Sequence, residues 1–276
     1  MQGQVLFIVW RESVEALLVV GIIAAWLRAH PEAATGRKFL WAGIATGLLA
    51  AFGLGAAILG LSEYFEGDQQ DYFQLTMVSL AAVLMVQMVF WMRKHGRTLK
   101  RDMENGLASH TSQANWWGML VLVAVAIARE GSETVVFLYG LGLSQQGEHL
   151  VSFLLSALSG FGLAFATFGL LQLGGRVFSW RAFFKFTEIL LLLLAGAMWV
   201  SAVEKLIALG WLPPLLDPVW NSSALLDDSG TVGSLVASLT GYRAHPAFTM
   251  VLTFALYWLG IVYGLKKASA VSRPVA

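Results

Sequence analysis

Long apolar stretches recur along the chain and are separated by short polar segments. A helix that crosses the ~30 Å apolar core of a bilayer needs roughly 20 mainly apolar residues, because each residue adds ~1.5 Å. The pattern predicts seven such helices, at residues 4–27, 39–61, 72–92, 117–141, 151–173, 183–208 and 247–265. We therefore expect an all-α polytopic membrane protein in which residues 1–276 form a single transmembrane domain.

The composition agrees with a chain that lies mostly in lipid. Apolar residues make up 57% and charged residues only 13% of the 276 positions, whereas soluble domains have about 25% charged residues. The chain has no cysteine, which excludes disulfide frameworks and thiolate metal sites. No basic block is longer than the loop at 93–101, so we expect no nucleic-acid partner.

Lys and Arg residues are distributed unequally between the two sides that these spans define. Of the 18 basic residues, Lys205 and Arg243 lie on one side, Arg11 and Arg129 lie within spans, and the other 14 lie on the opposite side. Loops rich in Lys and Arg remain in the cytoplasm. We therefore expect a multi-pass protein of the cell inner (plasma) membrane with its N-terminus outside and its C-terminus in the cytoplasm.

Small residues recur at every fourth position in two of the predicted spans. They are Gly43, Gly47, Ala51 and Gly55 in the second span and Ser152, Ser156, Gly160 and Ala164 in the fifth. Because small side chains let helix backbones approach closely, each stripe predicts a helix–helix contact.

Two spans contain charged residues in a repeated Arg-Glu-x-x-Glu pattern. A charged side chain at the middle of the membrane costs about 2.5–3.5 kcal/mol when it faces lipid. Six such groups would together cost more than the net stability of a typical protein. We therefore expect all six to face protein or water. They are Arg11, Glu12 and Glu15 in the first span and Arg129, Glu130 and Glu133 in the fourth.

Helical spacing places the charges of each motif on one side of its helix, with the two carboxylates about 60° apart. Each guanidinium can hold one carboxylate while other carboxylate oxygens remain available to a cation. These oxygens are hard ligands that suit ferric iron or similar ions rather than copper(I). The predicted metal ligands are Glu12, Glu15, Glu130 and Glu133, with Arg11 and Arg129 in support. The alternative is a structural helix bundle in which the ion pairs only join the two helices.

The order of the spans predicts how the two motifs meet. The motifs lie three spans apart, so their helices run in opposite directions. An inverted repeat of two three-helix units would bring both motifs together near the membrane midplane. We expect this architecture, with the seventh span as one extra helix outside the repeat.

Further carboxylates lie outside the motifs: Glu63, Glu66, Asp68 and Asp71 in the loop after the second span, and Glu188 in the sixth span. The loop carboxylates could capture cations at the outer mouth or form an ordinary solvated acidic surface. Glu188 could help to release the ion, carry a proton, or pair with Lys185 at the cytoplasmic interface.

Histidine and methionine positions bear on other kinds of metal site. All five His residues lie outside the predicted spans, which argues against the Glu-x-x-His pattern of a helical di-iron enzyme. Met77, Met85, Met88 and Met92 share one face of the third span. Such a stripe invites a copper(I) interpretation, but methionines at helical spacing more often serve as pliable packing.

The double motif resembles that of the oxidase-dependent iron permeases, which include the fungal high-affinity iron permeases and the bacterial Efe-type ferrous-iron-uptake permeases. The resemblance covers nearly the whole chain. Beside the two motifs, it rests on residues 89–94 at the end of the third span, 183–185 at the start of the sixth, and Gly241-Tyr242 before the seventh.

This resemblance implies a transporter, not an enzyme, that imports ferric or oxidised ferrous iron and holds no permanent cofactor. It also implies partners, namely a multicopper oxidase in fungi, or a periplasmic cupredoxin-type iron-binding protein and a haem peroxidase in bacteria. Some relatives are described as lead-uptake permeases, so lead or another divalent metal stays an alternative substrate. A membrane redox protein with a carboxylate di-iron site is a further alternative.

Overall fold

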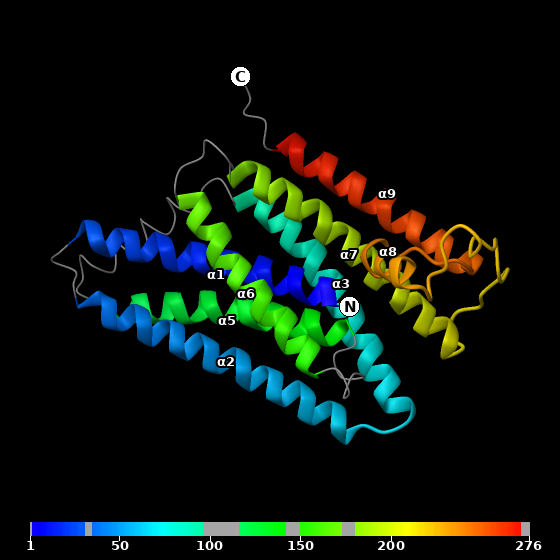
Figure 1. Ribbon diagram of the computed structural model, residues 1–276, viewed down its shortest axis with the longest axis horizontal. Helices are drawn as coiled ribbons and strands as arrows, with labels where there is room; N and C mark the ends of the chain where they lie inside the picture. Colours follow the sequence, from blue (N-terminus) through cyan, green and yellow to red (C-terminus); the bar gives the residue numbers. More distant parts are fainter. Residues whose placement is uncertain (1, 31–34, 96–115, 142–149, 173–179, 272–276) are drawn as a thin grey trace.

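The computed structural model describes residues 2–30, 35–95, 116–141, 150–172 and 180–271. These residues form eight α-helices and no strand. The helices are α1 (Gln2–Ala29), α2 (Gly36–Tyr64), α3 (Asp68–His95), α5 (Trp116–Gly140), α6 (Leu150–Gln172), α7 (Trp180–Ala208), α8 (Thr231–Thr240) and α9 (Phe248–Val271) (Figure 1). The all-α class predicted from the sequence is therefore confirmed.

Each predicted span falls on one of the long helices, although the end of the fifth, at residue 173, lies outside the described residues. By length and composition, α2, α3, α6, α7 and α9 are candidate membrane spans. The helices α1 and α5 are also long, with 28 and 25 residues, but each contains one charged motif. The membrane crossing of α1 and α5, and therefore the total of seven spans, stays a prediction.

The apolar pattern does not predict α8, a helix of 10 residues in the predicted outer loop before the last span. It is too short to cross a bilayer and therefore forms no long apolar stretch in the sequence. It ends at Gly241, whose positive φ of 76° favours glycine at a helix C-terminus. The helix packs against α7 and contacts α1.

The long helices associate in pairs that are distant in sequence. The helix α2 packs along α5, α1 along α6, and α3 along α7, while α1 and α3 also contact α5 (Figure 1). The helix α9 packs on α7 and adds a weaker contact with α3. The central contacts of α1, α3, α5 and α7 are made by fully buried side chains, among them Ile8, Met85, Phe137 and Leu194.

The helices at the edge of the bundle expose apolar side chains. Examples are Phe52 on α2, Leu158 on α6 and Leu259 on α9. A soluble protein rarely exposes such extensive apolar surface, whereas lipid tails solvate it. The distribution of apolar residues is therefore that of a membrane-embedded bundle.

Glycines permit the closest helix contacts. A Cβ atom added at Gly47 of α2 would lie 2.7 Å from the Cβ of Ile127 and 2.8 Å from the carbonyl oxygen of Ala124 on α5. A Cβ atom at Gly160 of α6 would lie 2.6 Å from the carbonyl oxygen of Leu6 on α1. Contacts this short would force the backbones apart, so both small-residue stripes mark helix contacts as predicted.

Replacement of Gly47 by leucine tests the α2–α5 contact. We expect Gly47→Leu to lower the free energy of unfolding by about 1–3 kcal/mol, because the side chain overpacks a close backbone approach. Gly53→Leu is the matched control on the same helix, since Gly53 is exposed and an added Cβ meets no atom within 4 Å. Thermal unfolding in detergent measures both variants, and equal losses would contradict the close contact.

Candidate metal site

The helices α1 and α5 bring the two charged motifs together inside the bundle. Glu12 lies ten residues after the first residue of α1 and Glu130 lies ten residues before the last residue of α5. At 1.5 Å per residue, both carboxylates lie about 15 Å from the corresponding helix end. Equal depth on two contacting helices allows residues of both motifs to form one group.

Three carboxylates meet in this group. One oxygen from each of Glu12, Glu130 and Glu133 lies within 4.8 Å of the other two. Glu12 is 2% exposed and Glu130 is 9% exposed, so bulk water does little to screen their mutual repulsion. Three carboxylate oxygens at such separations can surround a cation, and we call Glu12, Glu130 and Glu133 the carboxylate cluster.

The two arginines compensate part of this negative charge. Arg11 is fully buried, and its two Nη atoms each lie 2.5 Å from a carboxylate oxygen, Nη1 from Glu12 and Nη2 from Glu15. The Nε atom of Arg129 donates a hydrogen bond of 2.9 Å to Glu133 and lies 4.0 Å from Glu130. The i, i+4 pairs expected from helix geometry are present in both motifs.

The remaining oxygens of the cluster lack hydrogen-bond donors. Buried Oε2 atoms of Glu12, Glu130 and Glu133 have no hydrogen-bond partner within the described part of the chain. An unsatisfied buried acceptor is unfavourable, more so when it is charged. These oxygens therefore remain available to a cation, and their hard character suits iron and similar ions.

Glu15 differs from the other three motif carboxylates. It is buried and paired with Arg11, but it is not one of the three residues whose oxygens converge. The four glutamates therefore do not form a symmetric set in this structure. A ligand role for Glu15 stays a prediction.

The helix α3 contributes three residues that sequence reasoning did not assign to the site. Nη1 of Arg11 lies 2.9 Å from Sδ of Met88, and Nη2 lies 3.0 Å from Sδ of Met92. The guanidinium of Arg129 lies over the ring of Trp91, 4.3 Å from its centroid. The methionine stripe was a visible signal, but the interpretation as packing gave no reason to place it beside an arginine.

The carboxylates proposed for the outer mouth are remote from this cluster. Glu63, Glu66, Asp68 and Asp71 are all exposed where α2 ends and α3 begins. Asp71 precedes Met88 by 17 residues on α3, which corresponds to about 25 Å along the helix. Asp71 lies 3.6 Å from Lys205 of α7 in an ion pair.

Glu188 is also separate from the cluster and lies in α7. Its Oε1 atom accepts a hydrogen bond of 2.7 Å from Nε of Arg93 on α3, while Lys185, the partner considered from sequence, is exposed. The ion pair joins α3 and α7 at the end opposite to the Asp71–Lys205 pair.

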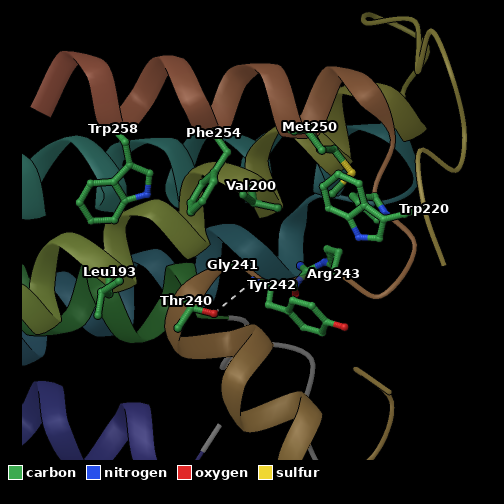
Figure 2. A pocket seen from close by; sticks show the side chains of 12 residues that line it. Leu193, Val200, Trp220, Thr240, Gly241, Tyr242, Arg243, Met250, Phe254 and Trp258 are labelled. Carbon is green, nitrogen blue, oxygen red and sulfur yellow. Dashed lines mark hydrogen bonds between the residues drawn. The ribbon is translucent and has the colours of Figure 1, made fainter. Parts of the chain in front are cut away.

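A cavity of about 470 Å³ lies between α7, α9 and the segment that precedes α9 (Figure 2). Its lining is mainly apolar and includes Trp220, Phe254 and Trp258, with Arg243 at one side. No carboxylate lines it. The cavity is therefore unrelated to the carboxylate cluster and offers no set of hard ligands for a cation.

The chain is similar to known iron permeases. The iron permease FTR1 family matches residues 3–272. A ferrous iron permease EfeU of Escherichia coli (strain 536) is 30% identical over 254 residues, which cover 91% of this chain and 90% of the relative. The protein of the same name in Yersinia pestis is 25% identical over 273 residues, covering 98% and 95%. No solved structure is significantly similar to the chain.

The match extends over almost the whole length of the chain and includes both charged motifs. The relatives are permeases, as the resemblance implied, so the prediction of a transporter rather than an enzyme is confirmed. The chain belongs to the iron permease FTR1 family.

Proposed function

We propose that this permease imports iron across the cytoplasmic membrane through the carboxylate cluster. The observation that carries the proposal is the convergence of three carboxylate oxygens within 4.8 Å on two helices of an iron permease. The net charge of the two motifs, four carboxylates against two guanidiniums, leaves an excess of two negative charges. A cation of charge two or three would nearly balance this excess inside an apolar bundle.

We infer that the ion lies in the cluster as ferric iron, since the hardest donors favour the harder oxidation state. The relatives are named as ferrous iron permeases. Ferrous iron would then be oxidised outside the membrane, by a periplasmic cupredoxin-type protein and haem peroxidase or by a multicopper oxidase. The exposed acidic turn of Glu63, Glu66, Asp68 and Asp71 is the proposed capture surface.

The inverted repeat gains support from the helix pairs. Exchange of α1–α3 with α5–α7 converts the α2–α5 contact into the α6–α1 contact and leaves the α3–α7 and α1–α5 contacts in place. When Arg11 is matched to Arg129, Leu6 and Val9 correspond to Ala124 and Ile127.

The close glycine contacts obey the same correspondence. Gly160 approaches Leu6 and Val9, and Gly47 approaches Ala124 and Ile127. Two three-helix units of opposite direction account for this agreement, with the cluster near the pseudo-two-fold axis. Rocking of one unit against the other would expose the cluster alternately to the two sides.

Substitution of cluster glutamates tests the transport route. We expect Glu12→Gln and Glu130→Gln each to reduce uptake of radiolabelled iron at least tenfold, because an amide removes a negative charge from the ligand set. Glu204→Gln is the control, since Glu204 lies half-exposed on α7 outside the cluster. Normal uptake by correctly inserted Glu12→Gln and Glu130→Gln proteins would refute the proposal.

Competition between metals separates iron from lead and other divalent ions. We expect excess unlabelled iron to abolish uptake of radiolabelled iron, and an equal concentration of lead to reduce it less than twofold. The measurement is initial uptake into whole cells with each competitor. Lead that competes as strongly as iron would instead identify a permease for divalent metals.

The proposed topology has seven spans, an outer N-terminus and a cytoplasmic C-terminus. Because the chain has no cysteine, single cysteines can be placed without background. We expect an impermeant maleimide to label Asn221→Cys in intact spheroplasts and Arg37→Cys only after permeabilisation, since both positions are exposed. The reverse pattern would contradict the orientation.

A further inference from the structure

The two motif arginines contact neighbouring residues of α3 in addition to their carboxylate partners. Trp91 and Met92 lie three and four residues after Met88, so the three side chains occupy one face within about 100°. The two sulfurs contact Arg11, and the indole ring contacts Arg129. We call Met88, Trp91 and Met92 the α3 seat.

Each Nη atom of Arg11 contacts one carboxylate and one sulfur. Nη1 lies 2.5 Å from Glu12 and 2.9 Å from the Sδ atom of Met88. Nη2 lies 2.5 Å from Glu15 and 3.0 Å from the Sδ atom of Met92. The two Nη atoms of Arg11 therefore contact two charged and two neutral acceptors.

The neutral acceptors differ from carboxylates in a way that matters for a cation site. A thioether sulfur is a weak acceptor without formal charge, and an aromatic face attracts a guanidinium through its quadrupole. A carboxylate forms much stronger hydrogen bonds with the same donor. The α3 seat therefore holds both guanidiniums in place without adding negative charge to the site.

A metal ion that binds Glu12 competes with Arg11 for the same carboxylate. Since Arg11 is fully buried, it has no water to replace the hydrogen bond that it would lose. Met88 supplies a second acceptor to that same nitrogen atom. When the ion binds Glu12, the guanidinium can lose its contact with that carboxylate and keep its contact with the Met88 sulfur. The remaining contact lowers the free energy required for metal binding.

We propose that Met88 and Met92 are positioning residues that set the affinity of the carboxylate cluster for iron by limiting how tightly Arg11 binds Glu12 and Glu15. This inference rests on the proposed function, because it assigns the competition to the transport site. Without the sulfurs, Arg11 has only carboxylates as acceptors. It then binds these carboxylates more tightly, and they are less available to the ion. Loss of the sulfurs would lower the affinity for iron and leave the metal ligands themselves unchanged.

The test is the double substitution Met88→Leu and Met92→Leu, with iron uptake measured over a range of concentrations. We expect the KM for iron to rise at least fivefold while kcat per inserted transporter changes less than twofold. Glutamine at both positions keeps the unbranched side chain and restores a neutral acceptor, so it is expected to return the KM to within twofold of the original. A purely structural role would not produce this rescue.

Met85→Leu is the matched control. Met85 is fully buried on the same helix one turn away, where it packs in the apolar core. We expect its KM to stay within twofold of the original. An unchanged KM in the double leucine variant, an equal rise in Met85→Leu, or failure of glutamine to rescue would each overturn the inference.

Glu12→Gln, measured in parallel, separates this inference from the proposed function. If Glu12→Gln abolishes uptake and the methionine variants leave the KM unchanged, the cluster transports iron and only the role of the α3 seat is wrong. If Glu12→Gln transports iron normally, the proposed route itself is wrong. The single variant Met92→Leu, at a partly buried position, provides the same KM readout if the double variant is poorly inserted.

Discussion

The burial of Arg11 is the constraint on which the centre of this protein depends. A guanidinium cannot be deprotonated under ordinary conditions and has five N–H donors, yet Arg11 has no exposed surface. Its partners must therefore come from the protein, and they come from its own helix and from α3. Glu12, one of the two carboxylates that compensate it, lies near Glu130 and Glu133 of α5, so the contacts of one buried charge connect three helices.

The sequence predicts the features of this centre that arise within a single helix. Apolar length predicts the helices, and the i, i+4 spacing predicts the pairs Arg11–Glu15 and Arg129–Glu133. It does not predict which neighbouring helix a polar face meets, because periodicity carries no information about distant contacts. For that reason the sequence indicates only a packing role for Met88, and it does not distinguish Glu15 from the carboxylates that converge.

Close helix packing lies directly beside the charged motifs. Gly47 contacts Ile127, two residues before Arg129, and Gly160 contacts Val9, two residues before Arg11. The outer helices α2 and α6 therefore cover α5 and α1 beside the charged motifs, where contact with lipid would be unfavourable. The small-residue stripes and the charged motifs, which are separate patterns in sequence, serve one purpose, since close packing excludes lipid from the carboxylates.

The position of α3 connects the site with the rest of the bundle. Its Met88 and Met92 contact Arg11, and its two ends form ion pairs with α7, Asp71 with Lys205 and Arg93 with Glu188. Partly exposed ion pairs are weak and break at little expense, whereas contacts around a fully buried guanidinium are not replaced by water. The contacts of Met88 and Met92 with Arg11 therefore join α3 to α1 at a place that water does not reach. The helix that carries neutral acceptors for Arg11 is therefore also the helix that ion pairs join to α7 at both ends.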